Sequence, residues 1–149
     1  LLPYPVYAES IKHKEDAIML NESVKALLKS HLWDLATCGR DGEPNVVPVT
    51  FKEVTEEGKL TVGDVFLETT LENLRAGGKI AVSVYDGEKL EGCQIKGTAE
   101  YLTAGPVVDA YKKQVEAMFR GAATAKGALV ITPREVIVTT PGPDNKKRL

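Results

Sequence analysis

The sequence predicts a mainly β protein, an antiparallel barrel of six or seven strands with about three peripheral helices. Between Leu32 and Thr139 most apolar residues either alternate with polar ones or form short runs rich in Val and Ile, and both patterns are typical of strands. Gly-containing turns join many of these runs as hairpins. Only three segments have a helical period, so the helices are expected at the periphery of the barrel.

The first half of the chain is predicted to form a helix, a hairpin, a third strand and a short second helix. Asn21 can cap the first helix, whose apolar residues recur at three and four positions. Pro48 cannot donate to a ladder, so we expect it at an edge, a bulge or a ligand. Gly77 and Gly78 end the second helix. The expected ranges are 21–31 and 71–76 for the helices, and 32–37, 44–51 and 59–62 for the strands.

The second half is predicted to contain four strands and the longest helix. Gly97 indicates a bulge or a close backbone approach in its strand. Pro106 suits the first turn of the helix. Pro133 is expected to divide the last β run into two strands. The expected strands are 80–85, 92–101, 128–132 and 136–139, with the helix beginning at 105–106.

Length and composition predict one globular domain. The 149 residues are 43% hydrophobic, which is enough for a single core. Residues 1–20 carry Pro3 and Pro5 without a clear period, so we interpret them as an N-terminal arm before a single domain at 21–149.

Charge, hydropathy and cysteines argue against several classes of protein. The net charge of −2 and the scattered basic residues argue against nucleic acid. No apolar run is long enough to cross a bilayer, so we expect no membrane contact and a soluble, cytoplasmic protein. Cys38 and Cys93 lack C-x-x-C spacing and a nearby His, which predicts two packed thiols rather than a metal or redox site.

The sequence offers little material for catalysis by side chains alone. His13 and His31 are the two histidines, and neither lies in a nucleophile motif. His31 is expected to end the first helix. The acidic residues show no metal-ligating or paired-carboxylate spacing, and neither familiar nucleotide-binding loop is present. We therefore expect no catalytic side chain and no metal, and a cofactor is expected to supply any chemistry.

The start of the second helix has two interpretations. Thr69 and Glu72 fit a capping box, in which Thr69 caps its own helix and Glu72 bonds back. A helix start also directs free N–H groups and a positive dipole end outward, so the same hydroxyls and amides suit an anion such as phosphate.

Four blocks, in this order, resemble the FMN-binding split-barrel family related to pyridoxamine 5′-phosphate oxidase, particularly its small single-domain members. The resemblance covers roughly residues 21–149. The blocks are Asp41–Val49; Asp64, Phe66, Thr69, Thr70, Asn73 and Leu74; Gly92–Tyr101 leading to Gly105-Pro106; and Ile131–Val136 with Pro141–Pro143.

The resemblance implies a homodimer of split β-barrels with FMN in clefts between the subunits. In relatives the strand matching 47–51 lies along the flavin ring, and the loop and helix start matching 65–73 hold the phosphate. Thr70 would donate its hydroxyl to the phosphate and Asn73 would brace the loop. Alternatively, alternate members of 47–51 belong to the core, and Asn73 bonds a neighbouring carbonyl. The implied FMN-binding residues are Pro48, Val49, Thr50, Phe51, Val65, Phe66, Thr69, Thr70, Asn73 and Gln94.

The chain departs from the family pattern before the helix-opening threonine. Relatives usually carry a lysine there, whereas this chain has Thr69, preceded by Glu68. A charge-assisted hydrogen bond contributes about 1.5–3 kcal/mol, so its loss weakens phosphate binding by about one to two orders of magnitude. Lys52 and Arg75 are the candidate replacements.

The leading hypothesis is an FMN-binding flavoprotein, an oxidoreductase or electron carrier with a small-molecule donor or acceptor. Pyridoxamine phosphate oxidase activity itself is disfavoured, because the chain is short and shows no basic cluster for a second phosphorylated ligand. The alternative is a cofactor-free or differently loaded binding module. A haem-handling member lacks an evident axial His. Trp33, Tyr85 and Tyr101 suggest an apolar dimer patch, although Trp33 fits the core equally well.

Overall fold

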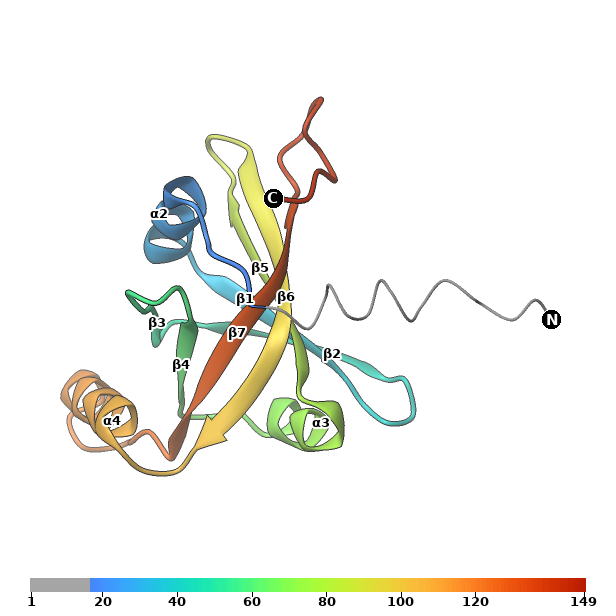
Figure 1. The fold of residues 1–149 in the computed structure, drawn as a ribbon. Helices are drawn as coiled ribbons and strands as arrows, with labels where there is room; N and C mark the ends of the chain where they lie inside the picture. The colour runs from blue at the N-terminus through green and yellow to red at the C-terminus, as the bar shows by residue number, and fades with distance from the viewer. Residues whose placement is uncertain (1–16) are drawn as a thin grey trace.

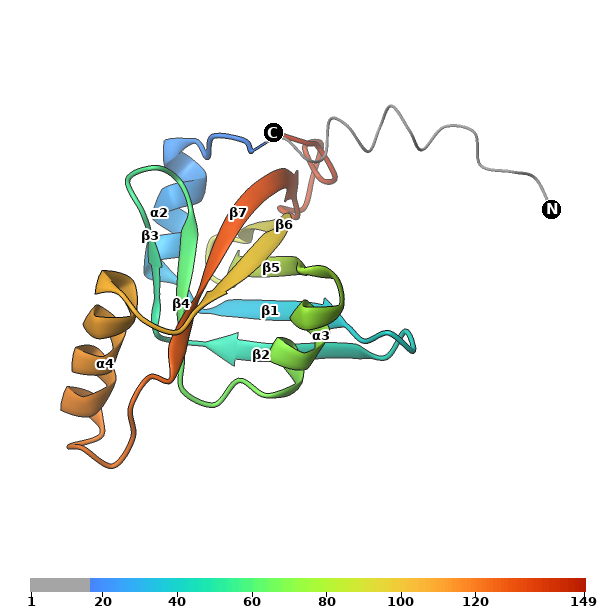
Figure 2. The same cartoon turned by 60° about the horizontal axis from the view of Figure 1, so that its bottom comes forward.

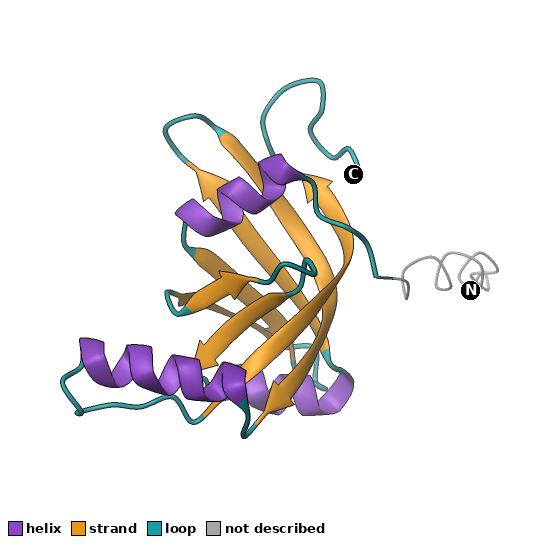
Figure 3. Cartoon of the chain, turned by 60° about the vertical axis from the view of Figure 1, so that its left-hand side comes forward, coloured by secondary structure: helices purple, strands orange, loops and turns teal. Residues whose placement is uncertain are grey.

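Seven antiparallel strands form one sheet that curls into a half-barrel, as Figures 1 and 3 show. The computed structural model describes residues 17–149. The order of strands in the sheet is β2-β1-β5-β6-β7-β4-β3. The mainly β split barrel predicted from the sequence is confirmed. The strands are β1 (Trp33–Cys38), β2 (Pro44–Val49), β3 (Lys52–Val54), β4 (Leu60–Asp64), β5 (Lys79–Asp86), β6 (Glu91–Leu102) and β7 (Gly127–Val138).

Three helices in the described part of the chain cover the ends of this half-barrel: α2 (Glu22–Ser30), α3 (Thr69–Gly77) and α4 (Pro106–Met118). Figure 3 shows α2 across one end and α3 and α4 at the other. Asn21 caps α2 as predicted, because its Oδ1 accepts the Val24 N–H at 2.9 Å. Residues 1–16 of the predicted arm lie outside the described residues. Residues 17–20, the last part of the predicted arm, pack on the barrel: Leu20 is buried, and the Ile18 N–H donates to the Pro133 carbonyl.

The predicted strand 44–51 is wrong at its C-terminal end. β2 stops at Val49, and after Thr50 and Phe51 the chain enters β3, a strand that the sequence interpretation missed. β2 and β3 lie at opposite edges of the sheet, so these two residues carry the chain across the open side of the barrel. Pro48 lies on an edge strand, where its missing N–H costs no ladder bond if it faces away from β1.

The two predicted C-terminal strands are one continuous strand, β7. Pro133 does not interrupt it, because β6 and β7 change register between Lys96 and Gly97. Gly97 pairs with Pro133 at this irregularity, which confirms the predicted bulge. A side chain at Gly97 would collide with the carbonyl of Thr132, so glycine is required at this position.

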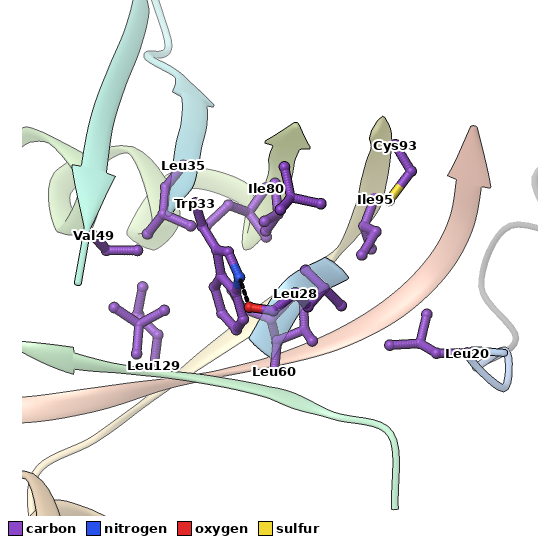
Figure 4. Packing of buried hydrophobic residues seen from close by; sticks show 14 of the residues in the cluster. Leu20, Leu28, Trp33, Leu35, Val49, Leu60, Ile80, Cys93, Ile95 and Leu129 are labelled. Atoms are coloured by element: carbon purple, nitrogen blue, oxygen red, sulfur yellow. Dashed lines mark hydrogen bonds between the residues drawn. The ribbon is translucent and has the colours of Figure 1, made fainter. Parts of the chain in front are cut away.

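Trp33 lies at the centre of the barrel core, which decides between its two interpretations (Figure 4). Its side chain is fully buried, and its Nε1–H donates to the Leu28 carbonyl at 2.8 Å. Lys52 Nζ donates to the same carbonyl at 2.8 Å and lies 4.9 Å from the Trp33 ring. These contacts fasten the C-terminal end of α2 to β1 and β3.

Candidate functional site

The first turn of α3 lacks the capping box that the sequence indicated. Thr69 is the first helical residue, and Glu68 occupies the N-cap position without a side-chain capping bond. The helix starts two residues earlier than predicted, so the T-x-x-E pattern is shifted out of the capping register. Within residues 17–149 no side chain accepts from the N–H groups of the first turn of α3. This helix start therefore retains donors for an external acceptor.

α3 lies beside the hairpin of β1 and β2 (Figure 2), and two side-chain hydrogen bonds hold it there. Asn45 Nδ2 donates to Thr70 Oγ1 at 3.2 Å, and Asn73 Nδ2 donates to Thr37 Oγ1 at 3.0 Å. Thr70 is buried, with 1% of its surface exposed. Its oxygen accepts from Asn45, and the described residues provide no acceptor for its own proton. Asn73 braces the helix against β1 instead of bonding a neighbouring carbonyl.

A buried carboxylate organises the loop between β4 and α3. Asp64 is fully buried; its Oδ1 accepts the Leu67 N–H at 3.0 Å and its Oδ2 accepts the Tyr101 hydroxyl at 2.6 Å. Burial, together with the Asp64 carboxylate, raises the pKa of Tyr101 to about 12. The sequence interpretation did not single out these two residues for a role in the site. An Asp directly after a buried strand was the available signal.

Phe51 and Phe66, both predicted to contact the flavin, lie in one aromatic cluster with Phe119, which was not predicted. The ring centroids of Phe51 and Phe119 are 6.2 Å apart, and those of Phe66 and Phe119 are 6.3 Å apart. Phe66 is 77% exposed. The cluster joins the β2–β3 crossover, the loop before α3 and the end of α4. Val65, half-buried, belongs to the apolar group packed around α4.

The remaining predicted residues lie in different surroundings. Val49 points into the barrel core, whereas Pro48 and Thr50 are exposed, which matches the alternative that alternate members of this strand are core. Thr69 is exposed at the helix start. Gln94 pairs with Ser83 and Ile137, seven positions before Tyr101 on β6, or about 23 Å along the strand. Within one chain the structure therefore does not bring Gln94 to the α3 loop.

Two cations were candidates to replace the missing lysine at the phosphate, and Lys52 is not placed to do so. Its ammonium group is bonded at the end of α2 and stacked on Trp33, and burial lowers its pKa. Arg75, exposed in the last turn of α3, lies close enough to Tyr101 for its charge to oppose the rise in that pKa. Arg75 therefore remains the candidate cation.

The cysteines and His31 take no part in this site. Cys93 is buried, and burial raises its thiol pKa to about 11, but Cys38 is exposed, so the prediction of two packed thiols is wrong for Cys38. His31 ends α2, where its Nε2 lies 3.4 Å from Asp86 Oδ2. Residues 17–149 contain no grouping of His, Cys, Asp and Glu suited to a metal ion. Over the same residues, every helix is too short or too polar to span a bilayer.

Fold and site together define a small split-barrel protein with an open helix start beside an exposed aromatic cluster. Residues 20–142 match the sequence model of the family described as pyridoxamine 5′-phosphate oxidase. The chain belongs to this family.

Individual proteins are similar to this chain in sequence or in structure. An uncharacterised protein of Methanocaldococcus jannaschii is 29% identical over 135 residues, which cover 89% of each chain. HupZ of Group A Streptococcus has a similar structure, with a TM-score of 0.72 and 26% identity over 85% of this chain and 98% of that one. An FMN-binding protein of Syntrophomonas wolfei has a TM-score of 0.71 over 82% of this chain and 87% of its own. At 18% identity, the last likeness shows the fold alone.

Proposed function

We propose that this protein is a flavoprotein that binds FMN non-covalently between the subunits of a homodimer and acts as an oxidoreductase or electron carrier. The observation that carries the proposal is the uncapped first turn of α3 beside the Thr70 hydroxyl. Family membership and the FMN-binding protein of the same fold support the choice of cofactor. When bound, the flavin supplies hydride or electron transfer between a small-molecule donor and acceptor.

The helix start fits the phosphate end of FMN. The first-turn N–H groups of α3 and the free proton of Thr70 are donors, and the positive end of the helix dipole favours an anion. Neither Thr69 nor Glu68 offers a positive charge. We therefore expect weaker binding than in relatives with a lysine at this position, by about one to two orders of magnitude.

The aromatic cluster fits the ring end of FMN. Phe51, Phe66 and Phe119 present edges and faces on which a planar ring can stack. Phe66 at 77% and Met118 at 63% exposure are large apolar side chains that a bound ring and a second subunit would cover. The role of these residues is to bind the ring and to exclude water from it.

Residues 21–149 would constitute this single FMN-binding domain. Cys38 and Cys93 are free thiols, which favours a reducing compartment, and we place the protein in the cytoplasm.

A flavin titration tests the proposal. FMN is added to flavin-free protein and to Thr69→Lys, with binding followed by flavin fluorescence and the oligomeric state by light scattering. Thr69→Lys should tighten FMN binding at least tenfold. Ser23→Lys, an exposed position on α2 at the other end of the barrel, adds the same charge and should leave FMN binding unchanged.

Riboflavin lacks the phosphate, so its affinity should not respond to Thr69→Lys. Failure of both proteins to bind FMN would refute the flavin assignment and favour a cofactor-free binding module. A monomer that does not dimerise with flavin bound would refute the shared site.

A further inference from the structure

A second concave site lies on the outer face of the sheet, against the C-terminal end of α3. Its volume is about 710 Å³. Small residues on three adjacent strands, Ala36, Ala81 and Gly97, form part of its apolar lining, with Gly77 of α3 at its margin. It therefore lies at the opposite end of α3 from the helix start assigned to the flavin phosphate.

Three cationic side chains from three strands line this cavity: Lys79 of β5, Lys96 of β6 and Arg134 of β7. They are far apart in sequence, and the pairing of the strands brings them together. Lys79 pairs with Thr98, which is two residues beyond Lys96 on β6. The sequence analysis identified no basic cluster for a second phosphorylated ligand, because a cluster assembled across strands leaves no local pattern in the sequence.

The bulge between β6 and β7 positions Arg134. Lys96 pairs with Glu135 and Gly97 with Pro133, so Arg134 is the extra residue with no partner across the ladder. Bulges redirect side chains, and they are frequent next to binding sites. Thr98 lines the same cavity, and its Oγ1 lies 3.5 Å from Arg134 Nη2.

The cavity carries uncompensated positive charge. Within residues 17–149 no carboxylate forms an ion pair with any of its three cations. Glu135 also lines it, but its Oε1 lies 2.7 Å from Arg148 Nε in an ion pair without hydrogen-bond alignment. Arg134 Nε is buried and has no acceptor among the described residues. A buried N–H without an acceptor is costly, so an anion at this position would relieve that cost.

We propose that this cavity binds a small organic phosphate, a dianion with a compact apolar body. The Arg134 guanidinium offers a planar fork for two phosphate oxygens, while Lys79 and Lys96 supply point charges. The Ala and Gly residues leave room for an apolar group beside the phosphate. The proposal stands independently of the flavin, because it uses none of the residues at the helix start.

Calorimetric titration with phenyl phosphate tests the proposal, with phenol and inorganic phosphate as partial probes. Phenyl phosphate should bind more tightly than either. Arg134→Gln and Lys96→Gln should each weaken it at least tenfold. Lys113→Gln, which removes an exposed charge from α4 away from the cavity, should leave it within twofold.

Thermal unfolding of each variant shows whether it is folded, and Lys79→Gln replaces a variant that is not. Phenol binding as tightly as phenyl phosphate, or unchanged affinity in Arg134→Gln and Lys96→Gln, would overturn the proposal. The proposal would also be overturned if phenyl phosphate did not bind to the wild-type protein. This result is expected if a second copy of the chain covers this face. FMN affinity should be unchanged in Arg134→Gln, and competition between FMN and phenyl phosphate would show that the two sites are one.

Discussion

The side-chain amide of Asn45 donates to the hydroxyl of Thr70 at 3.2 Å, across 25 positions of sequence. This bond joins the edge strand β2 to the first turn of α3. It also sets the direction of the Thr70 hydroxyl, since an oxygen that accepts on one side directs its proton to another. The hairpin therefore orients the donor that we assign to the flavin phosphate.

Thr70→Val keeps the shape of this side chain but removes its hydroxyl. The variant should be less stable by roughly 1–3 kcal/mol, because Asn45 loses its acceptor, and should bind FMN about ten- to a hundredfold more weakly. Fluorescence titration and urea unfolding measure the two effects. Thr70→Ser should recover most of both. Riboflavin binding that falls as much as FMN binding would assign Thr70 a structural role only.

Gly97→Ala should destabilise the protein by about 1–3 kcal/mol, because the added methyl group meets the Thr132 backbone at the bulge, where neither strand can easily shift. Gly87→Ala is the matched control: it lies in a turn with open space around its Cβ position and should change stability little. Urea unfolding of both variants measures the difference. Equal stability of the two variants would show that the bulge tolerates a side chain.

Local patterns in the sequence predicted most of the fold, because alternation, Gly turns and helix caps are local signals. Asn21 and Gly97 were assigned correctly for this reason. The β2–β3 crossover and the continuity of β7 through Pro133 were missed, since both depend on which strands become neighbours. For the same reason the sequence analysis missed the cluster of Arg134, Lys79 and Lys96, whose strands become neighbours only in the folded sheet. Family resemblance singled out Phe51 and Phe66 as candidate flavin contacts, which remains a prediction, whereas Phe119 reaches their cluster only through the packing of α4.

The two thiols should differ sharply in reactivity in the native protein. Cys38 is exposed, whereas Cys93 is 2% exposed and its thiol pKa is raised to about 11 by burial. One equivalent of a thiol reagent should react at once and the second only after denaturation. Cys38→Ser should abolish the fast phase and Cys93→Ser the slow one. Fast reaction of both thiols would show that β6 opens readily near Cys93.

Stability should fall in alkaline solution through Tyr111, which is 3% exposed in the packing of α4 on β4. Burial raises the pKa of its hydroxyl from 10.0 to about 12, although the hydrogen bond to Thr61, at 2.7 Å, opposes the rise. The folded state therefore holds this proton more tightly than the unfolded chain does. The resulting stabilisation is complete below pH 10 and is lost as the pH rises toward 12.

Tyr101, whose pKa is also about 12, titrates over the same pH range. Tyr111→Phe should therefore reduce the slope of stability against pH without abolishing it. At neutral pH the variant should lose about 1 kcal/mol with the hydrogen bond to Thr61. Urea unfolding across this pH range measures both effects, with Tyr85→Phe, at an exposed tyrosine, as the control. An unchanged slope in Tyr111→Phe would show that the pKa of this hydroxyl is the same in the folded and the unfolded chain.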